Sequence, residues 1–406
     1  MKRLLQITLG ILTSIGGFLD VGAIATSAQA GAEYRFKLLW AVALGTLCVI
    51  FLVEMAGRLA AASQHTIVDA MRAKLGFKFY VWPLAAELVV DFLTLAAEIG
   101  GVSVALQLVT GIKAAVWAMP VAFCVWLLLW KGTFGLIENG VSLLGLVTLV
   151  FVYAALRLHP HWGEVGRGLL PTLPHDKPFR YLFIVVGIIG AIISPYLLYF
   201  YSSGAVEEKW DKSYLGANKV TATLGMGFGS LISIGVLTVA ALVLNPQHVQ
   251  IDHYPQAAAM LTPVLGHWGV LAFAAALGIA CFGAALEVSS EVSYTAAQAF
   301  GWRWGVSAPP RENARFSLVY TLYLLAAGLM MTTGIDPLQL TIYTLALTTL
   351  LLPVVIGPFL LLMNDPQYVG KNRNGWVSNT VVILTLLVAC LLALAAIPLQ
   401  ILGGGG

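Results

Sequence analysis

The feature that most constrains this chain is a succession of eleven apolar stretches, most of them long enough to cross a lipid bilayer. Hydrophobic residues make up 59% of the sequence and charged residues only 10%, a balance outside the range of soluble domains. The sequence therefore predicts an all-α polytopic membrane protein with a single transmembrane domain. The stretches are 7–29, 38–61, 79–110, 115–130, 139–158, 181–202, 217–244, 267–300, 315–334, 338–363 and 377–402.

The distribution of basic residues predicts the orientation of the chain. Fifteen of the 22 lysine and arginine residues fall near inside connections if the N-terminus is cytoplasmic, which predicts a C-terminus outside the plasma membrane. Residues 64–76 are expected to form a short amphipathic helix at the cytoplasmic interface, and 159–180 and 245–266 to be outer loops. The net charge of +3 is too small to indicate a nucleic-acid partner.

Three local features favour structural interpretations. The basic N-terminus and Ala28-Gln29-Ala30 imitate a cleavable signal peptide, but the apolar part of such a peptide does not normally carry an aspartate. Residues 403–406 are interpreted as an addition and excluded from the fold. The four cysteines stand singly in apolar runs, which favours core positions over disulfides or metal ligands: Cys48, Cys124, Cys281 and Cys390.

One carboxylate, Asp20, lies inside the first apolar stretch, between Gly16-Gly17 and Gly22. A charged residue at bilayer depth costs at least about 2.5–3.5 kcal/mol and is rarely kept there without a partner or a ligand. The glycines weaken the helix on both sides, and an unwound helix frees carbonyl groups that bind cations. Asp20 is therefore a candidate ion-binding residue.

The sixth stretch is interrupted as well, at Ser194-Pro195. Proline removes a backbone donor and clashes with the preceding turn, so this helix is expected to kink or open near Ile193. A proline kink without a ligand is the alternative. Breaks in corresponding members of two five-helix halves indicate an inverted-repeat transporter with its site at the membrane midplane.

The residues around Asp20 resemble a known family signature. The segment DVGAIATSAQAGAEYRFKLLW is similar to the first helix of the NRAMP divalent-metal transporters, which reads DPGN followed by AT, QAGA and KLLW. SPYLLYFYSS resembles the family's sixth-span segment, and Glu98 its third-span glutamate. The resemblance covers essentially the whole chain. It implies a LeuT-like fold with helices 1 and 6 interrupted: a first five-helix repeat over 7–158, an inverted repeat over 181–363 and an extra helix over 377–402.

The departures from the family pattern fall where the family has its ligand and proton chemistry. The family's asparagine, methionine, histidine, third-span aspartate and tenth-span glutamine are replaced by Ala23, Ser194, Tyr196, Leu95 and, by a looser alignment, Leu345, while Val21 replaces its proline. Without the methionine thioether the site should favour hard cations. Smaller side chains would also let the ion keep part of its water, which suits Mg²⁺.

These departures resemble the NRAMP-related magnesium transporters, a divergent branch of the family. Within that resemblance, backbone carbonyls near Gly17 and Ala191 correspond to the family's carbonyl ligands. The implied metal site consists of Asp20, Ala23, Gly17, Ala191 and Ser194.

The third stretch carries a polar stripe. At about 100° per residue, Glu87, Asp91, Thr94 and Glu98 fall within an arc of roughly 60°, so the stripe should face an aqueous path. We expect Glu98 at the ion site or its vestibule, with a structural hydrogen bond as the alternative. For Glu87 and Asp91 a solvated inner vestibule and a specific function are both left open, and Tyr196 belongs to the same ion pathway.

Two further pairs of charged residues have structural interpretations. Glu287 and Glu291 are one helical turn apart and favour polar packing between helices. Glu54 and Arg58 have the same spacing and predict an interfacial ion pair.

Together these observations predict a membrane transporter, not an enzyme, for the hard divalent ions Mg²⁺ and Mn²⁺. It should act by alternating access as a monomer, without proton coupling and without a bound cofactor. The alternatives are a proton-coupled Mn²⁺/Fe²⁺ symporter, which the lost methionine and histidine disfavour, an Al³⁺ transporter and an ion channel. A LeuT-fold amino-acid transporter is also considered, although Asp20 would repel the substrate carboxylate.

Overall fold

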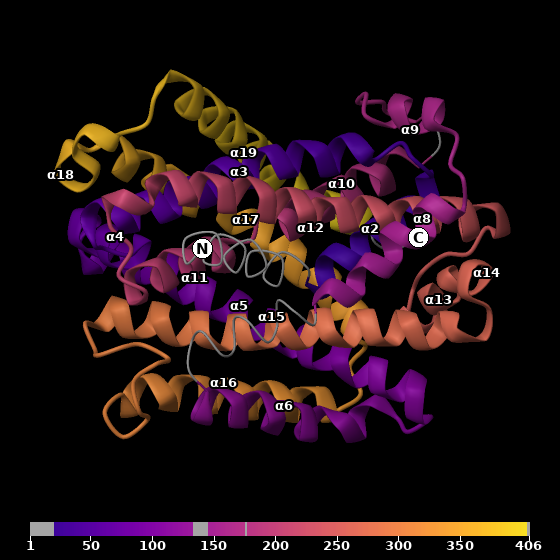
Figure 1. Ribbon diagram of the computed structural model, residues 1–406, viewed down its shortest axis with the longest axis horizontal. Coiled ribbons are helices and arrows are strands. Elements are labelled where there is room, and N and C mark those ends of the chain that lie inside the picture. The colour runs from indigo at the N-terminus through magenta and orange to yellow at the C-terminus, as the bar shows by residue number, and fades with distance from the viewer. Residues whose placement is uncertain (1–19, 133–144, 175–176, 404–406) are drawn as a thin grey trace.

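The computed structural model describes residues 20–132, 145–174 and 177–403, and every regular element in these ranges is helical. The long helices run side by side through the molecule (Figure 1). Apart from short 3-10 turns, they are α2 (Val21–Tyr34), α3 (Leu39–Ser63), α4 (Ile67–Leu75), α5 (Phe77–Thr110), α6 (Ala114–Lys131), α8 (Leu149–Arg157), α9 (Trp162–Gly168), α10 (Pro178–Ile192), α11 (Pro195–Glu207), α12 (Leu215–Val243), α13 (Tyr254–Ala258), α14 (Thr262–Leu265), α15 (Gly269–Phe300), α16 (Ala314–Thr332), α17 (Pro337–Asn364), α18 (Pro366–Val369) and α19 (Trp376–Gly403).

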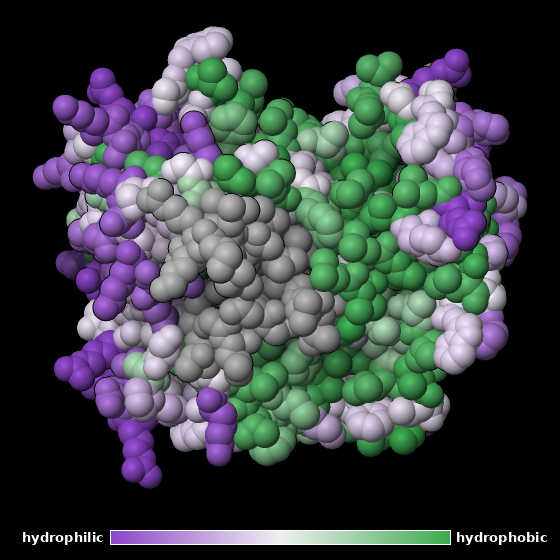
Figure 2. Space-filling model, in the orientation of Figure 1, coloured by the Kyte–Doolittle hydropathy of each residue, from purple (hydrophilic) through white to green (hydrophobic). Residues whose placement is uncertain are grey.

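Nine helical segments in the described ranges are long and apolar enough to cross a membrane. Figure 2 shows an apolar zone between two hydrophilic ends. One end carries α4 and α18, and the opposite end carries α9, α13 and α14 (Figure 1). This pattern is expected of a bilayer-spanning bundle. Residues 7–19 and 139–144 of the predicted stretches lie outside the described residues, so the total of eleven spans stays a prediction.

The predicted break in the sixth stretch is present. Helix α10 ends at Ile192 and α11 begins at Pro195, while Ile193 and Ser194 have the non-helical ψ angles 69° and 128°. Proline is tolerated in the first turn of a helix, because an N–H at that position has no intrahelical partner. Pro195 therefore begins α11, and the same residue prevents α10 from continuing. At the other predicted break, α2 begins at Val21 directly after Asp20.

Four helical segments meet around these two breaks. Helix α2 contacts α5, α10 and α17, and α17 also contacts α5 and α10. On its other side α2 is pressed against α12, because a Cβ atom on Gly31 would lie 2.2 Å from the Leu237 carbonyl oxygen. Only glycine permits this approach, which fixes the position of α2 relative to the rest of the bundle.

Two local predictions about charged segments agree with the structure. Arg58 Nη2 lies 3.0 Å from Glu54 Oε2, and Arg58 also donates to the Asn372 carbonyl and to Asn374 Oδ1, so the ion pair ties α3 to the segment before α19. The amphipathic helix expected within 64–76 is α4. Its residue Arg72 donates to the carbonyls of Gln298 and Ala299 at the C-terminal end of α15, where a cation is favourable.

The expectation of plain loops at 159–180 and 245–266 is wrong. The first contains α9 and the second contains α13 and α14. Helices α13 and α14 have proline in their first turns, and the side chain of Gln256 caps α13 by accepting from the His253 N–H at 2.9 Å. The prolines that suggested loops therefore start short helices instead.

The cysteine prediction holds in part. Cys48 and Cys281 are buried, and all four described cysteines are free thiols. Cys390 is half-buried, but Cys124 is exposed on the outer face of α6, which corrects its predicted core position. An apolar stretch in a membrane protein does not reveal which of its sides faces lipid, since both sides are apolar.

Candidate functional site

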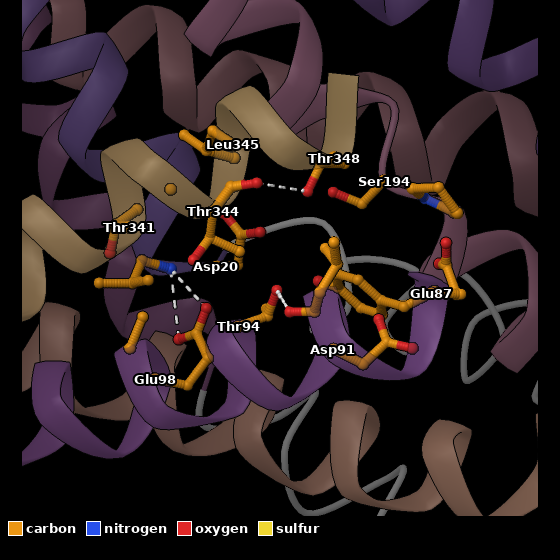
Figure 3. Close-up of a pocket in the computed structure, with 16 residues that line it drawn as sticks. Asp20, Glu87, Asp91, Thr94, Glu98, Ser194, Thr341, Thr344, Leu345 and Thr348 are labelled. Atoms are coloured by element: carbon orange, nitrogen blue, oxygen red, sulfur yellow. Dashed lines mark hydrogen bonds between the residues drawn. The ribbon is translucent and has the colours of Figure 1, made fainter. Parts of the chain in front are cut away.

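A cavity of about 20 Å³ lies where α2, α5, α17 and the break between α10 and α11 meet (Figure 3). Its volume accommodates about one water molecule. The residues that line it share oxygen-bearing or aliphatic side chains: Asp20, Val21, Gly22, Glu87, Val90, Asp91, Thr94, Ala97, Glu98, Ser194, Pro195, Tyr196, Thr341, Thr344, Leu345 and Thr348. Sulfur and imidazole ligands are absent from this lining.

Asp20 is the N-cap residue of α2. It is 4% exposed, has extended backbone angles, and its Oδ1 accepts the Ala23 N–H at 2.7 Å. This bond satisfies one of the amides that a helix start leaves without an intrahelical partner. Ala23 takes part through its backbone and does not line the cavity.

Glu98 reaches the same helix end from α5. It is fully buried, and its two carboxylate oxygens accept the Val21 N–H at 3.1 and 3.3 Å (Figure 3). The structural hydrogen bond considered for Glu98 is therefore present. Its place in the cavity lining also brings it together with Asp20.

The charges at this helix end do not balance. A helix N-terminus carries roughly half a positive charge, whereas ionised Asp20 and Glu98 would bring two full negative charges. None of the five ion pairs found among the described residues includes either carboxylate. A buried pair of this kind needs a cation or protons to compensate it.

Ser194 lies at the other break. Its hydroxyl donates to the carbonyls of Gly190 and Ala191, at 3.2 and 3.3 Å, and so satisfies the end of α10. The hydroxyl oxygen keeps its acceptor capacity and lines the cavity, as does Tyr196 in the first turn of α11. Ala191 is not part of the lining, and Gly17 lies outside the described residues.

Helix α17 contributes residues that sequence reasoning missed. The hydroxyls of Thr341, Thr344 and Thr348 donate to carbonyls one turn earlier in their own helix, at 2.7, 2.8 and 3.0 Å. All three residues line the cavity beside Leu345, so their oxygens add acceptors to its wall. The sequence pattern that could have identified them is the spacing of three and four residues between these threonines in an apolar stretch. This spacing places them on one helix face.

Glu87 and Asp91 line the cavity but are not solvated in this structure, so their place in a vestibule stays a prediction. Both side chains are buried, at 2% and 1% exposure. The reason is tertiary, because α15, which carries Glu291, packs along α5. The helical periodicity of α5 showed which residues share a face but not which helix covers that face.

Direct coordination by a cage of acidic, histidine or cysteine side chains is excluded for the part of the chain that the structure describes, since no group of three or more is arranged to hold a metal ion. A cation at this site would therefore combine few carboxylates with hydroxyl or carbonyl oxygens and water.

The fold is of the LeuT type found in membrane transporters. A crystal structure of the Eremococcus coleocola manganese transporter matches it with a TM-score of 0.81 and 22% identity, over 98% of this chain and 87% of that chain. Mhp1, a nucleobase-cation-symport-1 family transporter in a closed conformation, matches with a TM-score of 0.58 and 12% identity, over 97% and 90%.

Residues 10–398 match the Nramp family, natural resistance-associated macrophage protein-like, and the chain belongs to this family. Relatives of this chain include proteins named divalent metal cation transporter MntH. The protein of Brucella suis is 31% identical over 63% of this chain and 58% of its own length, and the protein of Agrobacterium fabrum is 26% identical over 94% and 84%. The resemblance predicted from the first-helix motif is thus confirmed.

Proposed function

We propose that this protein transports divalent metal cations across a membrane by alternating access around Asp20. The observation that carries the proposal is the buried pair of Asp20 and Glu98 at one helix end, with no described ion pair to compensate it and with oxygen-bearing side chains around it. The names of the relatives, divalent metal cation transporters and a manganese transporter, support the same substrate class.

Within this class we propose the hard ions Mg²⁺ and Mn²⁺. Carboxylate and hydroxyl oxygens suit these ions, whereas softer metals prefer thioether or imidazole ligands that the cavity lining lacks. The present cavity is too small for a hydrated ion, so the site has to widen when it opens toward either side. Asp20, Ser194 and Glu98 are the proposed ion contacts, with further contacts from carbonyls near Ala191.

We also propose that metal transport is not obligatorily coupled to protons. A relay near neutral pH is most simply built from histidine, but Tyr196 stands where the family has its histidine, and phenols ionise only near pH 10. Leu95, in place of the family's third-span aspartate, cannot titrate. The test uses liposomes with an internal pH dye and a clamped membrane potential. Metal entry should leave the internal pH unchanged, and metal-dependent acidification in the wild-type protein would contradict the proposal.

For the orientation in the plasma membrane, we propose that the end carrying α4 and α18 is cytoplasmic. We also propose that the protein works as a monomer. The basic residues Arg72, Lys74 and Lys371 gather at this end, as the positive-inside rule requires. Labelling of a Lys371→Cys variant by an impermeant maleimide should require permeabilised cells. Labelling of intact cells would reverse the orientation.

The runner-up is a proton-coupled Mn²⁺/Fe²⁺ symporter, and the pH-dye experiment separates it from the proposal. An amino-acid transporter with this fold is disfavoured, because Asp20 and Glu98 would repel a substrate carboxylate at the same helix end.

The proposal is tested with Asp20→Asn in proteoliposomes. Asparagine caps helices as well as aspartate does but carries no charge, so α2 should stay intact while Mg²⁺ and Mn²⁺ uptake falls at least about tenfold. Asp336→Asn is the matched control, because Asp336 caps α17 in the same way, by accepting the Gln339 N–H at 3.0 Å, at the outer surface. Normal uptake by Asp20→Asn would refute the site.

A further inference from the structure

A second group of acidic residues lies away from the Asp20 site. It consists of Glu87 and Asp91 on α5 and Glu291 on α15. At 1.5 Å per residue, Glu87 and Asp91 lie about 16 and 10 Å along α5 from Glu98, toward the end where α4 is found. Glu87 and Asp91 line the far part of the same cavity, as Figure 3 shows. We call these three residues the second acidic group.

The second acidic group collects oxygen atoms that lack partners. Among the described residues, eight buried side-chain nitrogen or oxygen atoms have no hydrogen-bond partner, and four of them belong to this group: both carboxylate oxygens of Glu87, Oδ2 of Asp91 and Oε2 of Glu291. Their residues are at most 2% exposed. Buried polar atoms are almost always hydrogen-bonded, so exceptions gathered in one place indicate a water or an ion that belongs there.

The bonds that the group does make are few and do not supply positive charge. Glu291 Oε1 accepts the Thr295 hydroxyl at 2.5 Å. None of the five ion pairs in the described part of the chain includes a member of the group. Three acidic side chains at bilayer depth without a basic partner are costly to keep, so a cation or protons must compensate them.

We propose that Glu87, Asp91 and Glu291 form a second binding station for a divalent cation, on the path between the Asp20 site and the α4 end. Glu87 offers both oxygens toward the shared cavity. Because the described acidic side chains are not arranged to hold a metal directly, the station binds the ion partly through water, as proteins commonly bind Mg²⁺. This inference depends on the proposed function in one respect only, namely that the bound ion is a divalent cation.

The experiment counts the Mn²⁺ ions bound to the full-length protein in detergent. Bound ions are measured as the loss of the electron paramagnetic resonance signal of free Mn²⁺. The wild type should bind two ions, Asp20→Asn one, Glu87→Gln/Asp91→Asn one, and the combination of all three substitutions none. The control pair Glu164→Gln/Asp252→Asn removes two carboxylates outside the proposed sites, the half-buried Glu164 of α9 and the exposed Asp252 just before α13, and should leave two ions bound.

A second measurement can overturn the station with Asp20→Asn alone. Saturating Mn²⁺ should still raise the melting temperature of Asp20→Asn, and this rise should vanish when Glu87→Gln and Asp91→Asn are added. No Mn²⁺-dependent rise in Asp20→Asn overturns the second station, even if the other variants fail to fold.

The outcomes separate the two proposals. If Asp20→Asn removes all bound Mn²⁺ and Glu87→Gln/Asp91→Asn binds as the wild type does, the second station is wrong and the Asp20 site stands. If only Glu87→Gln/Asp91→Asn loses an ion, the Asp20 site is wrong and the second station stands. A wild type that binds no Mn²⁺ contradicts both.

Discussion

The backbone N–H of Val21 donates to both carboxylate oxygens of Glu98, at 3.1 and 3.3 Å, across 77 positions of the sequence. This contact fastens the beginning of α2 to the middle of α5, next to the carboxylate of Asp20. An ion that attracts Glu98 must share or replace the bond. Under the proposed function, ion binding and the position of α2 would therefore be coupled through one carboxylate.

Two substitutions of Glu98 should separate its charge from its hydrogen bond. The amide oxygen of glutamine can still accept from Val21, whereas alanine leaves a buried N–H without this partner, at a cost of about 1–3 kcal/mol. We expect Glu98→Ala to melt at a clearly lower temperature than Glu98→Gln, and both to weaken Mn²⁺ uptake about tenfold or more. Wild-type Mn²⁺ affinity in Glu98→Gln would make Glu98 a purely structural residue.

Ion selectivity should follow the ligand atoms at the two breaks. Ser194→Met brings a thioether to the cavity wall, and Ala23→Asn adds an amide in the first turn of α2. Since thioethers favour softer metals, the double variant should prefer Mn²⁺, Fe²⁺ or Cd²⁺ over Mg²⁺ more than the wild type does. Competition uptake in proteoliposomes measures this ratio. An unchanged ratio would mean that side-chain softness does not set selectivity here.

The close contact between α2 and α12 predicts a large effect of one methyl group. Gly31→Ala would put a Cβ atom 2.2 Å from the Leu237 carbonyl oxygen and 2.8 Å from Ala240 Cβ. Overpacking of this kind costs typically about 1–3 kcal/mol, so the melting temperature should fall. In Gly227→Ala, on α12, the new methyl group meets nothing within 4 Å, and this variant should be as stable as the wild type or slightly more stable. Equal melting temperatures for both variants would contradict the packing of α2.

The outer segment that holds α13 should loosen when one hydroxyl is removed. Tyr254 is 2% exposed and donates to the Val21 carbonyl at 3.2 Å, so it links α13 to the first turn of α2. Tyr254→Phe loses this bond, worth about 0.5–1.5 kcal/mol, and amide hydrogen exchange over 254–261 should become faster. Tyr343→Phe removes an exposed hydroxyl on α17 and serves as the control. Unchanged exchange in Tyr254→Phe would show that the link is not needed to hold α13.

Several features follow from the sequence because their causes are local. Long apolar runs predicted the long helices from α3 onward, although the fifth stretch is described only in part. A helix is the structure that satisfies a backbone in lipid within one segment. Ser194-Pro195 predicted the end of α10, because proline acts on the turn that precedes it. The pair of Glu54 and Arg58 was predictable for the same reason, as one turn separates them. Asp20 stood out because a carboxylate in an apolar run is expensive.

The tertiary structure decided which side chains meet. Periodicity placed Glu87 and Asp91 on one face of α5, but only the packing of α15 buries them and adds Glu291. Thr341, Thr344 and Thr348 join the cavity because α17 crosses both α5 and α10, and Glu98 caps α2 because the bundle brings α5 to Val21. Helix faces in a membrane protein are apolar toward lipid and toward neighbours alike, so hydrophobicity does not encode which faces pair. That choice depends on close contacts such as the one at Gly31, which exist only once the helices are assembled.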